Sequence, residues 1–168
     1  MSSILFICTA NRFRSILAET IFLDELTKRD LQSEWIVGSA GTWTENGLSP
    51  MPETLTTAQE LGLKLSSLKS RLINAEMINK YSLILVMESG QKEALNLEFP
   101  NSLGRVHLLS EVTCGMAYDI PDPFMSEEPA VGVAKDLYQL IRDGFEKICQ
   151  LADELKSLNG EKYDVLNS

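Results

Sequence analysis

Short apolar runs alternate along this chain with longer segments in which apolar residues recur every three or four positions. The short runs span Ile4 to Cys8, Trp35 to Gly38, Ser82 to Met87 and Val106 to Leu109. Apolar runs of this length, with few polar positions in alternation, are typical of strands buried on both faces of a sheet. We therefore predict four strands.

The longer segments have the apolar spacing of amphipathic helices. The first is expected to begin near Ser15, and two others are expected at 53–61, ending at Gly62, and at 89–98, stopped by Pro100. A long helix closes the chain. Its apolar residues form one stripe: Val133, Leu137, Leu140, Ile141, Phe145, Ile148, Leu151 and Leu155.

Strand and helix alternate in an order that indicates a parallel sheet with helices on both faces. Residues 39–42, 43–52 and 114–129 are expected to be turns and loops, because small residues or prolines are frequent there. No repeat or linker divides the sequence, so residues 1–168 are predicted to form a single α/β domain. Ligands of such sheets bind beyond the carboxyl ends of the strands, where Cys8 begins a loop.

The charge balance limits the partners that the protein can have. Fifteen basic and 24 acidic residues give a net charge of -9, which disfavours non-specific binding to nucleic acid or to an anionic membrane. Any phosphate site must therefore be a local positive region. No apolar run approaches the roughly 20 residues of a membrane-spanning helix, and no basic leader precedes the first apolar run.

The three cysteines favour a reducing compartment. Cys8, Cys114 and Cys149 are odd in number and widely spaced, and none belongs to a CxxC pair. This pattern argues against a disulfide framework and against a zinc site. We therefore expect a cytoplasmic protein, while its oligomeric state stays open.

The segment CTANRFRS, which follows the first strand, carries the groups of an anion-binding loop. A loop before a helix N-terminus directs successive backbone N–H groups inward, and the same partial positive charge stabilises a thiolate at Cys8. The guanidinium of Arg14 can bind two phosphate oxygens, and Ser15 can hydrogen-bond the thiolate. Asn11 tolerates the left-handed backbone that a tight loop needs.

By itself the spacing Cys-x5-Arg is a weak signal. Cys8 can equally be a buried thiol at the end of a strand, and Arg14 a solvated residue in the first turn of a helix. An arginine there lies at the unfavourable end of the helix dipole, which mildly favours an anionic partner. On this motif alone, the structural and functional interpretations are about equally favoured.

The segment DIPDPF adds a carboxyl group. Phosphoryl transfer to a thiolate needs an acid for the leaving oxygen and then a base for the water that cleaves the phosphocysteine, and Asp122 can serve both steps. Taken alone, this aspartate is more simply interpreted as the first residue of an Asx turn.

Together, these segments resemble the low-molecular-weight protein tyrosine phosphatase family over most of the chain. The matching segments occur in the family's order: ILFICTANRFRSILAE, SAGT at 39–42, SLILVME at 82–88 and DPF at 122–124. The first is similar to the family's first strand, phosphate loop and first helix, and the last is similar to its general-acid loop. The order makes the resemblance far more specific than any single motif.

The resemblance implies a flavodoxin-like, three-layer α/β/α fold with a four-stranded parallel sheet, and it implies that the protein uses no metal or organic cofactor. It implies that Cys8 attacks phosphorus, that Arg14 and the loop amides stabilise the phosphate oxygens, and that Asp122 moves the protons. The phosphate-binding residues that it implies are Thr9, Ala10, Asn11, Arg12, Phe13 and Ser15, with Ser39 supporting the loop. Trp43 and Phe124 are candidate walls for an aromatic substrate, although a partly buried loop aromatic is an equally good interpretation of Trp43.

Four residues of the loop depart from the family's usual pattern. Phe13 stands where a second cysteine is usual, which removes protection through a local disulfide. Ala10 stands for glycine and strains the loop if that position needs a positive φ. Ile16 stands for proline. Arg12 stands for a small apolar residue or threonine, and its cation either favours substrates with extra negative charge or points to solvent.

Several functions remain open besides that of a protein phosphotyrosine phosphatase. The substrate can instead be phosphoarginine or a small aryl or sugar phosphate, and the chain can be a phosphocarrier or a non-catalytic phosphate-binding module. An arsenate reductase of the thioredoxin-coupled type is less favoured, because it needs a closely spaced cysteine pair. The SLKSR segment, with Lys69 and Arg71, is expected to be a solvated loop or, alternatively, a basic rim near the site.

Overall fold

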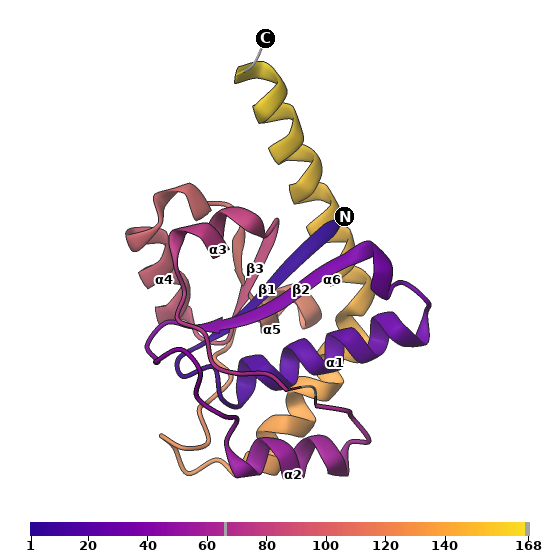
Figure 1. Ribbon diagram of the computed structural model, residues 1–168, viewed down its shortest axis with the longest axis vertical. Coiled ribbons are helices and arrows are strands. Elements are labelled where there is room, and N and C mark those ends of the chain that lie inside the picture. Colours follow the sequence, from indigo (N-terminus) through magenta and orange to yellow (C-terminus); the bar gives the residue numbers. More distant parts are fainter. Residues whose placement is uncertain (66, 167–168) are drawn as a thin grey trace.

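The strands and helices alternate as the sequence predicts (Figure 1). The structure is a computed structural model that describes residues 1–65 and 67–166. Its strands are β1 (Ser2–Cys8), β2 (Trp35–Gly41), β3 (Leu83–Val86) and β4 (Val106–Leu108). Its α-helices are α1 (Arg14–Lys28), α2 (Pro52–Glu60), α3 (Ala75–Lys80), α4 (Ser89–Glu98), α5 (Leu109–Cys114) and α6 (Ala130–Leu166), and its 3-10 helices are η1 (Gln32–Glu34) and η2 (Pro100–Ser102).

The four strands form one parallel sheet in the order β2-β1-β3-β4. The central strand β1 is buried along its whole length, and its side chains alternate between two cores. Ile4, Phe6 and Cys8 face the core that α1 and α6 cover, whereas Leu5 and Ile7 face the core that α3 and α4 cover. Figure 1 shows these helices on opposite sides of the sheet. The flavodoxin-like three-layer fold is thereby confirmed.

The closing helix α6 is longer than its packing requires. The first part of its apolar stripe is buried against α1 and α5, and its last turns project beyond the body in Figure 1. None of the described helices is long and apolar enough to cross a membrane.

The predicted boundary of the second strand was wrong. Ser39 to Gly41, expected in a turn, continue β2, because they stay in register with β1 up to the pair Cys8 and Gly41. Small side chains allow this, and the buried Ser39 hydroxyl has polar partners described below. The short helices α3 and α5 were not predicted. Asn74 caps α3 through a hydrogen bond from the backbone N–H of Met77, and Leu109, expected in a strand, begins α5.

Close packing of α6 against α5 depends on the absence of a side chain at Gly144. A Cβ there would lie 2.5 Å from the Cβ of Thr113 and 2.7 Å from its Cα. Gly144→Ala is therefore expected to lower the free energy of unfolding by about 1–3 kcal/mol through overpacking. That cost outweighs the gain in helix propensity of at most about 1 kcal/mol. Urea unfolding followed by circular dichroism measures the difference.

Gly132→Ala on the same helix is the matched control. A Cβ at Gly132 would meet only Pro129 Cγ, at 3.8 Å, which is ordinary contact. This variant should be as stable as the wild type or slightly more stable. Equal stability of the Gly144 and Gly132 variants would contradict the close packing of α5 and α6.

Candidate active site

The loop between β1 and α1 surrounds the sulfur of Cys8 with hydrogen-bond donors. Cys8 ends β1 and is only 2% exposed. Its Sγ lies 3.0 Å from the Ser15 hydroxyl and accepts a hydrogen bond from the backbone N–H of Asn11 at 3.3 Å. Because α1 begins at Arg14, the positive end of the helix dipole adds to these donors. The sulfur is therefore held between hydrogen-bond donors at the start of a helix.

Asn11 holds the loop in shape. Its φ is 54°, in the left-handed region that the sequence analysis expected of it. Its Nδ2 donates to the hydroxyls of Ser15, at 2.7 Å, and Ser39, at 3.0 Å, while its Oδ1 accepts from the backbone N–H of Arg71 at 2.9 Å. Ala10 does not have a positive φ, so the strain considered for that position does not arise.

Arg14 is buried and aimed at the loop that carries Asp122. Its side chain is 2% exposed, and its Nη1 donates to the carboxylate of Glu88 at 2.6 Å and to the carbonyl of Ile120 at 2.8 Å. Its Nη2 lies 3.6 Å from Oδ2 of Asp122. The guanidinium is thus held in one orientation, as a bidentate phosphate ligand requires.

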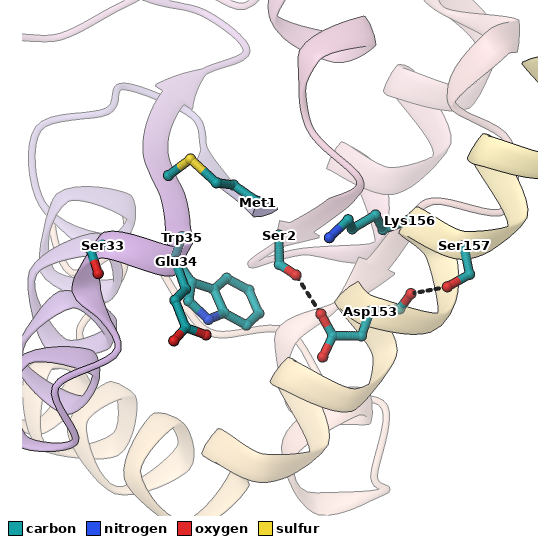
Figure 2. Close-up of a pocket in the computed structure, with 8 residues that line it drawn as sticks. All are labelled: Met1, Ser2, Ser33, Glu34, Trp35, Asp153, Lys156 and Ser157. Carbon is teal, nitrogen blue, oxygen red and sulfur yellow. Dashed lines mark hydrogen bonds between the residues drawn. The ribbon is translucent and has the colours of Figure 1, made fainter.

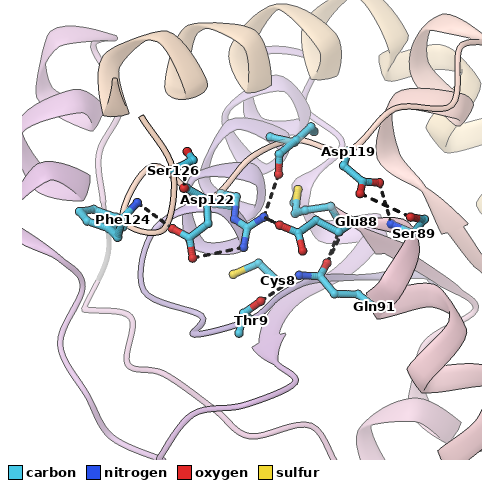
Figure 3. Close-up of polar contacts among 12 residues, drawn as sticks. Cys8, Thr9, Glu88, Ser89, Gln91, Asp119, Asp122, Phe124 and Ser126 are labelled. Carbon is cyan, nitrogen blue, oxygen red and sulfur yellow. Dashed lines mark hydrogen bonds and ion pairs between the residues drawn. The ribbon is translucent and has the colours of Figure 1, made fainter. Parts of the chain in front are cut away.

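Asp122 uses its two carboxyl oxygens differently: one forms an Asx turn, and the other faces Arg14 in the same pocket. Its Oδ1 accepts from the backbone N–H of Phe124 at 3.0 Å, which forms an Asx turn, while Oδ2 faces Arg14. The turn is reinforced by the Ser126 hydroxyl, which donates to the carbonyl of Asp122. Figure 3 shows the carboxyl groups of Asp122 and Glu88 joined by dashed lines to the same guanidinium, that of Arg14. The turn therefore orients the carboxyl group toward the site.

The first turn of α4 contributes two residues that sequence reasoning missed. Glu88 and Gln91 cap this helix reciprocally, and Glu88 also binds Arg14. The amide Nε2 of Gln91 donates to the hydroxyl of Thr9 at 3.2 Å (Figure 3). A capping pattern directly after β3 was the available signal, because that strand ends at the same edge of the sheet as β1.

A pocket of about 280 Å³ opens above the loop. Its lining consists of eight residues proposed from the sequence and two methionines: Cys8, Thr9, Ala10, Arg12, Phe13, Arg14, Asp122, Phe124, Met51 and Met125. The rings of Phe13 and Phe124 meet edge to face with centroids 5.5 Å apart. Asn11, Ser15 and Ser39 lie buried behind the loop.

Trp43 does not line the pocket. Its side chain is 84% exposed, and its connection to the loop is a backbone hydrogen bond from its N–H to the carbonyl of Thr9. Arg71, expected in a solvated loop or a basic rim, instead donates from Nε and Nη2 to the carbonyl of Ser39. The arginine therefore supports β2 from behind the loop.

A second, larger hollow lies at the opposite edge of the sheet (Figure 2). It has a volume of about 640 Å³ and is formed at the amino ends of β1 and β2 with α6, where the Ser2 hydroxyl donates to Asp153. Its charged residues are Glu34, Asp153 and Lys156, and it contains no cysteine or histidine. The smaller pocket at Cys8 is therefore the candidate active site.

Glu19 is buried beneath the loop, where it accepts a hydrogen bond from the Ser39 hydroxyl. Burial raises the pKa of Glu19 above its ordinary value of 4.5, and the Ser39 hydrogen bond and the charge of Arg71 only partly oppose this. The folded chain therefore holds this proton more tightly than the unfolded chain. As a result, the free energy of unfolding should decrease as the pH rises from about 4.5 toward the raised pKa.

Glu19→Gln tests this pH dependence. Glutamine cannot titrate, yet it keeps an oxygen that can accept from Ser39. Urea unfolding at a series of pH values is expected to show a wild type that loses stability relative to the variant with rising pH. Parallel stability curves for the two proteins would show that Glu19 titrates alike in the folded and unfolded chains.

Comparisons with known proteins agree with this geometry. The family model described as low molecular weight phosphotyrosine protein phosphatase matches residues 3–162. The chain is 29% identical to a protein-arginine-phosphatase of Bacillus subtilis over 91% of this chain and 96% of that protein. It is 27% identical to the low molecular weight protein-tyrosine-phosphatase YfkJ of the same organism, over 94% and 100%.

A solved structure adds a chemical detail. A cysteine-to-serine mutant of the YwlE arginine phosphatase with a phosphorylated active-site serine has a TM-score of 0.77 to this chain and 26% sequence identity. The match covers 92% of this chain and 95% of that one. In that protein, the active-site side chain carries a covalent phosphoryl group.

Proposed function

Because the chain belongs to the low molecular weight phosphotyrosine protein phosphatase family, and so is a cysteine-dependent phosphoric monoester hydrolase, we propose that its substrates are phosphotyrosine residues of proteins. We propose further that Cys8, Arg14 and Asp122 carry the reaction. The observation that supports this assignment is the convergence of a donor-surrounded thiol, a fixed guanidinium and an oriented carboxyl group on one pocket.

In the first step, the Cys8 thiolate attacks phosphorus in line with the leaving oxygen. The S–P bond forms while the P–O bond to tyrosine breaks, and Asp122 gives its proton to the departing phenoxide. Arg14 and the backbone N–H groups of the loop bind the three other phosphate oxygens, on which charge develops. The Asn11 N–H and the Ser15 hydroxyl hold the sulfur in place.

In the second step, water attacks the phosphocysteine. Asp122, now ionised, takes a proton from the water as the O–P bond forms and the S–P bond breaks. The thiolate leaves with the electron pair, and the Ser15 hydroxyl, 3.0 Å from the sulfur, stabilises it as a leaving group. Inorganic phosphate then dissociates, and Arg14 returns to its contact with Asp122.

The walls of the pocket favour an aryl phosphate. Phe13, Phe124, Met51 and Met125 present apolar surface around the thiol, and the edge-to-face pair of rings is suited to an aromatic neighbour. Arg12 lies in the same lining and is half-buried. Its cation would repel the guanidinium of phosphoarginine, whereas the ring of phosphotyrosine is neutral.

Protein arginine phosphatase is the second candidate function, and the similarity to the Bacillus subtilis protein-arginine-phosphatase favours it. The kcat/KM for the same peptide carrying phosphotyrosine or phosphoarginine distinguishes the two candidates. We expect phosphotyrosine to be preferred by roughly tenfold or more, because one unfavourable charge pair in a partly buried site costs on the order of 1–2 kcal/mol. Faster hydrolysis of phosphoarginine would overturn the substrate proposal and leave the phosphatase chemistry intact.

We also propose that residues 1–168 act as one domain in the cytoplasm. The family match spans nearly the whole chain, which supports a single unit. A thiolate nucleophile works only while it is reduced, which supports a reducing compartment.

A further inference from the structure

Two cations meet on one serine at the rim of the candidate active site. Arg12 donates from Nε to the carbonyl oxygen of Ser49 at 2.7 Å. Lys69 donates from Nζ to the hydroxyl oxygen of the same serine at 2.9 Å. The two side chains come from segments 57 positions apart in the sequence, so the fold itself brings these positive charges together.

Neither cation has a carboxylate partner among the residues that the structure describes. Within the part of the chain that the structure describes, no carboxylate lies within 4.0 Å of Arg12 or Lys69, although acidic residues outnumber basic ones by 24 to 15. Two like charges on one residue repel each other, and an anion between them relieves that repulsion. On a chain of net charge -9, this pair is the kind of local positive region that an anionic ligand needs.

The backbone around the pair is fixed by hydrogen bonds. Ser70, next to Lys69, donates its N–H to the carbonyl of Leu48. The Ser70 hydroxyl in turn accepts a hydrogen bond from the N–H of Leu48. The carbonyl of Arg12 accepts from the N–H of Met51 at 3.0 Å and from the hydroxyl of Thr54 at 2.6 Å. Ser49 lies between these two anchored segments, so the position of the pair is built into the fold.

The pair of cations also lies beside the pocket that contains Cys8. Arg12 belongs to the phosphate loop and lines the same pocket as Cys8, while Ser49 and Lys69 are exposed next to it. The Nη atoms of Arg12, the Nζ of Lys69 and the Ser49 hydroxyl remain able to donate to a ligand from solvent. A substrate with its phosphate in the pocket is therefore able to reach this pair with a second group.

We propose that Arg12, Lys69 and Ser49 form an anion subsite that binds the carboxylate of an acidic residue close to the phosphotyrosine in the substrate protein. The inference rests on the proposed function and specifies its substrate class. The subsite explains why the loop carries a cation, Arg12. It also gives Lys69 a role, the binding of a substrate carboxylate, that hydrolysis of a small aryl phosphate does not require.

The test compares two phosphotyrosine peptides that differ only in having glutamate or glutamine at the positions flanking the phosphotyrosine. In the wild type, kcat/KM for the glutamate peptide is expected to be about 3- to 10-fold higher, as two exposed or half-exposed charge pairs allow. Lys69→Gln should reduce this ratio, and the double variant Arg12→Gln, Lys69→Gln should bring it to about 1. Added salt should also reduce the wild-type ratio, because the charges are exposed.

Lys147→Gln is the matched control, since it removes one exposed lysine on α6 without touching the rim. It should keep the wild-type ratio. Hydrolysis of p-nitrophenyl phosphate, which has no second anion, should be unchanged in Lys69→Gln.

The possible failures are distinguishable. Equal kcat/KM for the two peptides in the wild type would overturn the subsite and leave phosphotyrosine hydrolysis standing. A glutamate preference that survives in the double variant would also overturn it. If p-nitrophenyl phosphate is hydrolysed but neither peptide is, the phosphotyrosine proposal falls and the subsite falls with it.

Discussion

Cys8→Ser is expected to lower kcat for p-nitrophenyl phosphate by at least roughly 10⁴-fold, as removal of a catalytic nucleophile does in other hydrolases. The hydroxyl of serine stays protonated at neutral pH, and no histidine lies in the pocket to act as its base. A serine that does become phosphorylated would also be a poor leaving group in the second step. The variant should fold normally, because the hydroxyl can take over the hydrogen bonds with Asn11 and Ser15.

Cys114→Ser is the control for this variant. Cys114 is exposed, and its thiol contacts the carbonyl of Ser110 rather than the phosphate loop. Its kcat should match that of the wild type. Turnover by Cys8→Ser within tenfold of the wild type would contradict nucleophilic catalysis by the thiolate.

Asp122→Asn is expected to reduce kcat by roughly 10²–10⁴-fold, the usual cost of losing a general acid and base. Asparagine preserves the Asx turn, because its Oδ1 can still accept from the N–H of Phe124. The variant therefore removes the proton transfers and leaves the loop in place. Stopped-flow or steady-state assays with a series of aryl phosphates measure the loss.

Substrates with different leaving groups show whether Asp122 acts as the acid in the first step. p-Nitrophenoxide departs readily without protonation, whereas the phenoxide of phenyl phosphate or phosphotyrosine depends on the acid. The fall in kcat/KM, which reports the first step, should therefore be larger for phenyl phosphate than for p-nitrophenyl phosphate. An equal fall for both substrates would mean that Asp122 does not protonate the leaving oxygen.

Asp119→Asn in the same loop is the matched control. Asp119 accepts hydrogen bonds from the backbone N–H and the hydroxyl of Ser89 at the start of α4 (Figure 3). Asparagine can accept from the same N–H, so the kcat of this variant should change little. A loss as large as that of Asp122→Asn would assign the effect to the loop rather than to one carboxyl group.

The sequence made the location of the candidate site predictable because its central residues are local to one strand end. Cys8, Asn11, Arg14 and Ser15 lie within eight consecutive positions, from the last residue of β1 to the first turn of α1, and the strand–helix alternation locates that segment at the carboxyl edge of the sheet. Asp122 needed the resemblance to the family, since an Asx turn was the simpler interpretation of its segment taken alone. In the structure, Asp122 forms the Asx turn through Oδ1 and faces Arg14 through Oδ2.

The contacts that Glu88 and Gln91 make with the loop could not be predicted in this way. Glu88 binds Arg14 across 74 positions, and Gln91 reaches Thr9 across 82, so neither contact leaves a local pattern. The register of β2 escaped prediction for a related reason, because the small residues from Ser39 to Gly41 look like a turn until β1 lies beside them. The partner of Arg12 likewise depends on a loop–loop contact.

The covalent intermediate is the most direct test of the account. The wild type should be mixed with p-nitrophenyl phosphate, quenched in denaturant at neutral pH during turnover, and mapped by mass spectrometry. We expect one phosphoryl group on the peptide that contains Cys8, and none on the same peptide from Cys8→Ser quenched at the same time. Release of p-nitrophenol at the full rate with Cys8 unmodified at every time point would contradict the phosphocysteine mechanism.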